Sequence, residues 1–179
     1  MACEYKEGDH RDLLTQYDRS TEDFLIAEIR RKFPGHSFVA EERENQDRTD
    51  GFVWIIDPID GTTNFVCRKK HFAVSAALYE NHCPVFGLVY DVIADDMYWG
   101  ISGGGAGINE KSLEKLSPVP LRESIVDASL NSIEIFYNRY GIKLFDLARD
   151  IRGHRSGGAA SLAVCQIAKR SEEHTSELQ

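Results

Sequence analysis

Residues 52–65 have the sequence FVWIIDPIDGTTNF, and this stretch determines how the chain folds. Its first five residues, 52–56, are all apolar, and such a run predicts a strand that is buried on both faces. Proline has no N–H to donate to a sheet ladder, and its φ angle is fixed. We therefore expect the strand to end at Asp57-Pro58 and the chain to turn there, with Asp60 just beyond the turn.

This turn gathers several oxygen atoms near one point. The carboxylates of Asp57 and Asp60 are three residues apart, and the carbonyl group of Ile59 lies between them. Mg²⁺ prefers several oxygen ligands in octahedral geometry, so the set predicts a magnesium site. Gly61-Thr62-Thr63 follows at an expected helix start, where free backbone N–H groups favour an anion. A metal beside an anion predicts a site for a phosphate ester.

Three other interpretations of the turn fit the sequence less well. An EF-hand loop needs the spacing D-x-[DN]-x-[DN]-G, which residues 57–61 lack. A haloacid-dehalogenase-like phosphatase would carry DxDGT with a nucleophilic first aspartate, whereas the register here is DxxDGT. A DPxDG surface turn without function would not ordinarily follow so apolar a strand.

The flanking sequence predicts helices and an antiparallel meander. A helix is expected to begin at Ser20-Thr21 and to stop at Pro34-Gly35, with apolar residues at helical spacing between them. The expected strands, separated by turn signals, span 37–40, 72–79, 85–92 and 97–101. We also expect a charged loop over 43–51, a tight hairpin turn over 103–107, and helices over 138–149 and 157–169. Helices combined with a meander predict an α+β layered protein.

Composition excludes several classes of protein. The 179 residues include 21 Lys and Arg and 29 Asp and Glu, a net charge of −8, which argues against nucleic acid as a partner. Phosphate esters remain possible, because a bound metal reverses the local sign of charge. No stretch approaches the roughly 18 apolar residues of a membrane span, so no membrane partner is expected. The four cysteines form no CxxC pair, which favours a cytoplasmic location.

Residues 57–65 resemble the DPIDGTTNF signature of the inositol monophosphatase family. Three further segments are similar to the family's DLVTxxD, SFxxEE and GxRSxGSAA motifs, and they span residues 12–18, 37–42 and 153–160. The resemblance covers about residues 6–170. It implies a layered αβαβα sandwich of the inositol-monophosphatase and sugar-phosphatase type.

The resemblance also implies roles for individual residues. Two or three Mg²⁺ ions would be held by Glu41, Asp57, the carbonyl group of Ile59, and Asp60. The substrate would be contacted by Asp60, Gly61, Thr62, Gly158 and Ala159. Glu41 and Thr62 would orient a water molecule for in-line attack on phosphorus, so no covalent intermediate is needed.

The reaction implied by the resemblance is hydrolysis of a phosphate monoester of a small polyol or sugar. Inositol 1-phosphate is the first expectation, with inhibition by lithium and a homodimer for the full-length protein. Phosphatases of sugar bisphosphates, histidinol phosphate or nucleotide bisphosphates are open alternatives. A hypothesis of another class is a chain that binds metal without turnover.

The family pattern is incomplete in this sequence. The WDxAAG-like segment, whose aspartate completes the metal cluster, has no counterpart, since Trp54 and Trp99 are the only tryptophans. Ala159 stands where Ser or Thr is usual. We expect residues 1–170 to be the family domain without its N-terminal helix and C-terminal portion. Residues 171–179 resemble a translated cloning adapter and are expected to be structureless.

Overall fold

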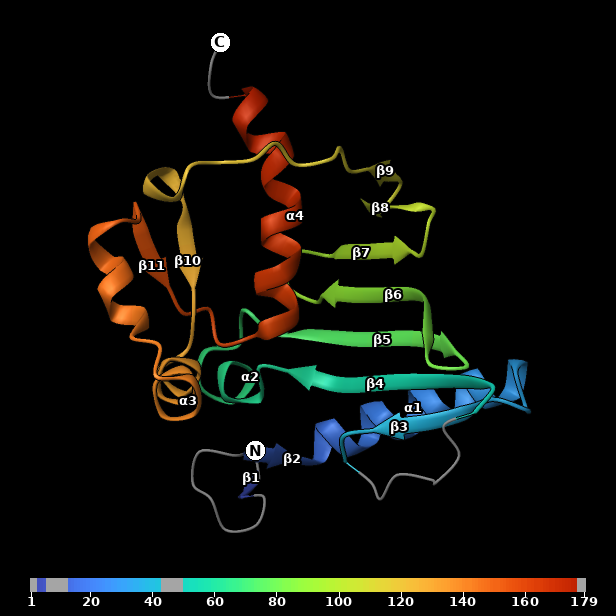
Figure 1. Cartoon of the computed structure of the whole chain (residues 1–179). Helices are drawn as coiled ribbons and strands as arrows, with labels where there is room; N and C mark the ends of the chain where they lie inside the picture. Colours follow the sequence, from blue (N-terminus) through green and yellow to red (C-terminus); the bar gives the residue numbers. More distant parts are fainter. Residues whose placement is uncertain (1–2, 6–12, 43–49, 177–179) are drawn as a thin grey trace.

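A seven-stranded sheet forms the centre of the fold in the computed structural model, which describes residues 3–5, 13–42 and 50–176 (Figure 1). Its strand order is β3-β4-β5-β6-β7-β8-β9. The bounds are β3 Ser37–Ala40, β4 Phe52–Asp60, β5 Ala73–Glu80, β6 Cys83–Asp91, β7 Asp96–Ile101, β8 Gly105–Ile108 and β9 Lys111–Ser112. Strand β3 is parallel to β4, and every later pair is antiparallel. The predicted meander and the hairpin turn between β7 and β8 are therefore confirmed.

Helices and two small sheets surround this central sheet. The helices are α1 Gln16–Lys32, α2 Thr62–Arg68, α3 Leu130–Tyr140 and α4 Ala160–Ser176, with short 3₁₀ helices at Leu121–Glu123 and Leu144–Arg149. Strands β1 (Cys3–Tyr5) and β2 (Leu13–Thr15) pair antiparallel, whereas β10 (Ile125–Asp127) and β11 (Gly153–Arg155) pair in parallel. The predicted α+β class is confirmed.

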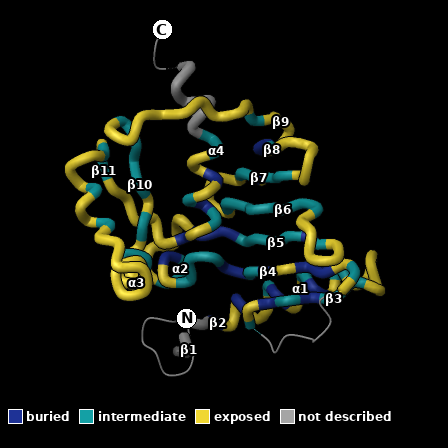
Figure 2. Tube along the Cα trace, in the orientation of Figure 1, coloured by how far each residue is buried: buried dark blue, intermediate teal, exposed yellow. Residues whose placement is uncertain are grey.

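Helices α1 and α4 pack on opposite faces of the central sheet. Ile26 of α1 packs against a cluster that includes Trp54, Ile56 and Leu78. Leu162 of α4 packs instead on Ala73, whose side chain points to the other face because successive residues of a strand alternate. Figure 2 shows the resulting buried centre between the two helices and the sheet.

Strand β4 differs from its prediction in two respects. Ile55 is 43% exposed, so the strand is not buried on both faces. The reason is that α4 crosses only one end of the strands (Figure 1). The strand also continues through Pro58 to Asp60, because a register shift in its pairing with β5, between Asp57 and Asp60, accommodates the missing N–H.

Helix α1 begins four residues earlier than predicted, at Gln16 rather than near Ser20. Thr15 caps it: the Thr15 side chain accepts a hydrogen bond from the N–H of Tyr17, and the N–H of Thr15 donates to Asp18. This reciprocal capping box is a stronger start signal than the Ser-Thr pair inside the helix. The predicted stop is confirmed, since α1 ends at Lys32 before Pro34-Gly35.

The C-terminal helices also have different bounds from those expected. The predicted helix over 138–149 is two elements, because Gly141 adopts a left-handed φ of 66° that ends α3. Helix α4 begins at Ala160, after Gly157 and Gly158, and it continues to Ser176. The expectation that residues 171–176 are structureless is therefore wrong. Most of the predicted charged loop, residues 43–49, and Asp12 of the 12–18 motif lie outside the described residues.

Candidate phosphate and metal site

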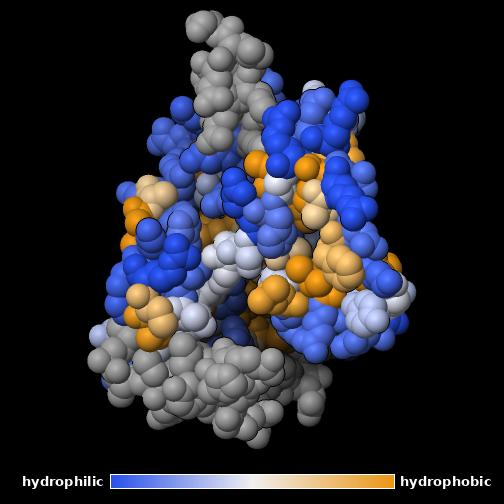
Figure 3. Space-filling model, turned by 90° about the vertical axis from the view of Figure 1, so that its left-hand side faces the viewer, coloured by the Kyte–Doolittle hydropathy of each residue, from blue (hydrophilic) through white to orange (hydrophobic). Residues whose placement is uncertain are grey.

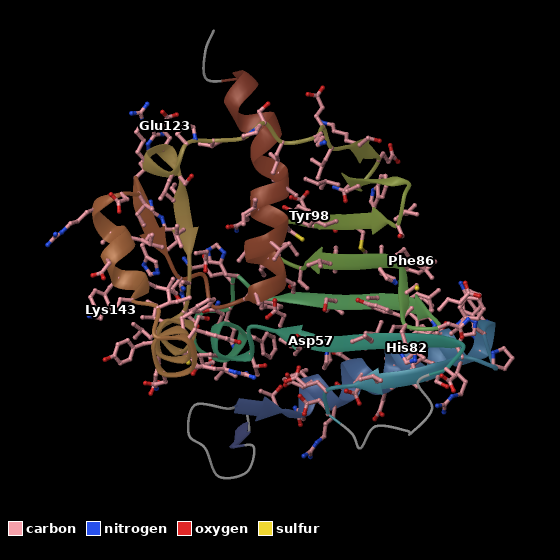
Figure 4. All side chains as sticks on the ribbon, in the orientation of Figure 1. Asp57, His82, Phe86, Tyr98, Glu123 and Lys143 are labelled. Carbon is pink, nitrogen blue, oxygen red and sulfur yellow. The ribbon has the colours of Figure 1, made fainter. Side chains whose placement is uncertain are left out.

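The end of β4 leads directly into the short helix α2, as Figure 4 shows at the labelled Asp57. Gly61 joins the two elements with a left-handed φ of 86°. A Cβ atom at Gly61 would come within 3.0 Å of the Ala159 Cβ and of the Gly158 carbonyl oxygen. Glycine is therefore required at this position both by its conformation and by the close approach of the chain ahead of α4. The contact brings together Gly61, Gly158 and Ala159, three of the residues predicted to contact a substrate.

The three predicted acidic ligands influence one another electrostatically. Burial, together with the negative charges of Glu41 and Asp60 and a hydrogen bond with the Glu41 side chain, raises the pKa of Asp57 to about 7. The N–H of Ile59 donates to the Asp57 Oδ1 at 3.1 Å and partly opposes this rise. Clustered carboxylates repel one another, so such a group favours either a proton or a cation.

Asp60 is turned toward the first residues of α4. Its carboxylate accepts hydrogen bonds from the N–H groups of Ala160 at 3.1 Å and Ser161 at 2.7 Å, and from the Ser161 hydroxyl. These bonds satisfy backbone donors that have no partner within the helix. Asp60 thus joins the end of β4 to α4 across 100 residues of sequence.

The donor chemistry of the site suits Mg²⁺, which prefers carboxylate and carbonyl oxygens. Glu41 and Asp57 are in contact, and Asp60 lies close enough to raise the pKa of Asp57. Over residues 3–5, 13–42 and 50–176, however, no three His, Cys, Asp or Glu side chains form a ready-made metal cage. The residue types therefore suit Mg²⁺, but in this structure the Asp60 carboxylate accepts hydrogen bonds from α4.

Thr62 is held by a residue for which the sequence alone predicted no role. The Thr62 hydroxyl lies 3.2 Å from Asp18 Oδ1 and 3.0 Å from the carbonyl oxygen of Ile59. Asp18 is 1% exposed, and its other oxygen accepts from the Thr15 hydroxyl at 2.6 Å. The 12–18 motif contained the only signal for Asp18, because its partner is 44 residues away in the sequence.

Asn64 is a second residue that sequence reasoning missed. Its side-chain Nδ2 donates to the carbonyl oxygens of His71 and Gly157, each at 2.8 Å. The side chain is buried, and it fixes α2 against the glycine-rich segment that precedes α4. This bridge holds Gly158 and Ala159 beside Gly61.

A cavity of about 650 Å³ lies beside this segment. Its lining includes Arg68, Asp127, Arg155, Gly157 and Lys169, so it carries both signs of charge. The cavity adjoins the candidate site at Gly157 but is not lined by Glu41, Asp57 or Asp60. Among the helices that the structure describes, none has the length and hydropathy needed to cross a bilayer.

Comparison with known proteins shows which family the chain is similar to. The model of the "Inositol monophosphatase family" matches residues 1–175. The chain is 40% identical over 161 residues to an inositol-1-monophosphatase of Bacillus subtilis, covering 88% of this chain and 60% of that protein. The chain thus spans about three fifths of the length of this curated relative.

Solved structures of similar proteins have the same fold. A staphylococcal IMPase-I complexed with products has a TM-score of 0.84 at 26% identity, covering 95% of this chain and 62% of that one. An IMPase/NADP phosphatase complexed with Mg²⁺ and phosphate has a TM-score of 0.83 at 28% identity, covering 94% and 62%. These likenesses confirm the predicted fold type.

Proposed function

The chain belongs to the inositol monophosphatase family, and on that premise we propose that it takes part in Mg²⁺-dependent hydrolysis of a phosphate monoester. Inositol 1-phosphate is the substrate to test first. The observation that supports the proposal most strongly is the cluster of mutually interacting carboxyl groups at the end of β4, beside a threonine held by a buried aspartate.

The proposed ligands of two or three Mg²⁺ ions are Glu41, Asp57, the Ile59 carbonyl group and Asp60. Bound there, Mg²⁺ would neutralise the phosphate and stabilise the attacking and leaving oxygens. The raised pKa of Asp57 supports this proposal, because a cation relieves the same repulsion that a proton does.

Water is the proposed nucleophile, oriented by Glu41 and Thr62. Asp18 accepts a hydrogen bond from the Thr62 hydroxyl, which leaves the lone pairs of the Thr62 oxygen available to the water. The Glu41 carboxylate accepts the proton as the water oxygen bonds to phosphorus. The P–O bond to the ester oxygen breaks as the new P–O bond forms, the leaving alkoxide takes up a proton from solvent, and Glu41 releases its proton to solvent.

The proposed phosphate and substrate contacts are Asp60, Gly61, Thr62, Gly158 and Ala159. The close approach of Gly61 to the Gly158-Ala159 segment supports a single site built from both parts of the chain. Ala159 offers no hydroxyl, so the hydrogen bonds there would come from the backbone. The full-length protein is proposed to be a homodimer.

Phosphate release from inositol 1-phosphate tests this function. For the full-length protein we expect release that requires Mg²⁺, stops with excess EDTA, and is inhibited by lithium. The Asp57→Asn variant should lose it, whereas Asp146→Asn, at an exposed aspartate, should retain it. Release that continues undiminished in EDTA would overturn the assignment.

The same assay distinguishes the alternatives. Faster release from a nucleotide or sugar bisphosphate would change the substrate but keep the mechanism. Mg²⁺ binding without any release would favour a metal-binding chain that lacks turnover. The Asp60 carboxylate is bonded to the start of α4, and the residues that the structure describes form no ready-made metal cage. An incomplete metal cluster of this kind supports the second function, metal binding without turnover.

A further inference from the structure

Helix α1 carries two carboxylates that are almost completely buried. Asp18 and Glu22 are each 1% exposed. They are four residues apart, so they lie on the same face of the helix. A buried carboxylate is costly unless it is hydrogen-bonded, and Asp18 is already explained by its bonds to Thr15 and Thr62.

Glu22 binds the backbone of the segment that follows β3. Its Oε2 accepts a hydrogen bond of 2.8 Å from the N–H of Glu42, which lies 20 residues later. The pairing of β3 with β4 ends at Ala40 and Ile56, so Glu42 lies beyond the ladder. A side chain of α1 therefore holds the backbone at the point where the sheet no longer does.

The hydrogen bond between Glu22 and the Glu42 N–H lies next to Glu41, a proposed metal ligand. The N–H of Glu42 belongs to the peptide plane that begins at the Cα atom of Glu41. Holding that plane restricts the backbone of Glu41, and with it the direction of the side chain that contacts Asp57.

We infer that Glu22 is a positioning residue, which aims Glu41 at the metal site through the Glu42 N–H. The inference rests on the proposed function. One turn of α1 then sets both groups that orient the water: Asp18 holds Thr62, and Glu22 holds the peptide next to Glu41.

Calorimetric titration of Mg²⁺ into the whole chain tests this role. Glu22→Met removes the acceptor at similar length, and Glu22→Gln keeps one. Glu28→Met is the matched control, because Glu28 is on the same helix with a side chain 46% exposed. We expect about tenfold weaker binding for Glu22→Met, less than about threefold for Glu22→Gln, and no change for Glu28→Met, since loss of a partner of a metal ligand costs about 10–100-fold.

A double-mutant cycle separates this role from general support of the fold. If Glu22 acts through Glu41, Glu22→Met should weaken Mg²⁺ binding no further in a Glu41→Gln background. Additive losses in the two variants would overturn the inference.

Hydrogen exchange of the wild-type chain gives a readout that needs no variant to fold. The Glu42 amide should be protected, and exchange as fast as an unbonded amide would overturn the inference. Mg²⁺ binding that depends on Glu41 but is equal in Glu22→Met and Glu28→Met would overturn the role of Glu22 alone. No Mg²⁺ binding by the wild type would overturn the inference and the proposed function together.

Discussion

The pKa of Asp57, in the candidate site, is raised well above its ordinary value. Its carboxyl group is partly buried, contacts Glu41, and lies in the field of Asp60, so its ionised form is disfavoured. A proton or a divalent cation relieves the same repulsion, and the two therefore compete for the site. This competition connects the acidity of one residue to the stability of the metal-free protein.

The stability of the metal-free chain should fall as pH rises from 5 to 8. The folded pKa of Asp57, about 7, lies above its ordinary value of 3.8, so between these values the folded state binds more protons. The destabilisation is absent below the lower value and complete above the higher one. Thermal unfolding in EDTA measures it, and Asp57→Asn should remove this part of the pH dependence. A midpoint that rises through this range in the wild type and is unaffected by Asp57→Asn would contradict a raised pKa of Asp57 as the cause.

Asp60→Asn should cost more than Glu42→Gln, both in stability and in phosphate release. The amide cannot accept all the bonds that the carboxylate takes from Ala160 and Ser161, so urea unfolding should show a loss of about 1–3 kcal/mol. Glu42→Gln leaves intact the backbone N–H that Glu22 binds. Equal losses in the two variants would show that the metal and phosphate contacts have been assigned to the wrong acidic residues.

At the scale of elements, local sequence determined some features and long-range contacts determined others. The apolar run of β4, the turn signals of the meander and the stop at Pro34-Gly35 act over a few residues. They predict a strand, its hairpin neighbours and a helix end where the structure has them. The start of α1 differs from its prediction, because both Thr15 and Ser20 can cap a helix and only the structure shows that Thr15 does so. The bonds that tie Asp18 to Thr62 and Asn64 to Gly157 could not be predicted locally, since these partners are 44 and 93 residues apart in the sequence.

Asn64→Ala should destabilise the junction between α2 and α4. Removal of the side chain leaves the carbonyl groups of His71 and Gly157 without this donor, at a cost of about 1–3 kcal/mol. Urea unfolding checks the value. Asn138→Ala, at an exposed asparagine of α3, should change stability by less than about 0.5 kcal/mol. If both variants unfold at the same urea concentration, the bridge contributes nothing.

At the scale of the whole molecule, apolar side chains remain on the surface despite the net charge of −8. Figure 3 shows orange apolar patches between polar regions on the side of α3, β10 and β11. On α4, Val164 and Ile167 are 68% and 56% exposed.

We expect the 179-residue chain to self-associate through such surfaces. Size-exclusion chromatography should show an apparent mass that increases with concentration. Val164→Glu with Ile167→Glu should reduce this association, because the two residues are three apart and lie on one side of α4. A wild-type chain that elutes as a monomer at every concentration would contradict this expectation.

The proposed hydrolysis of a phosphate ester depends on metal binding by the carboxylates at the end of β4. Calorimetric titration of Mg²⁺ into the wild type, Asp57→Asn and Asp146→Asn measures that binding without intervening steps. Asp146→Asn is the control, because Asp146 is exposed. We predict that the wild type and Asp146→Asn bind Mg²⁺ and that Asp57→Asn does not. Equal binding by all three proteins, or none by the wild type, would contradict the assignment of the metal to these carboxylates.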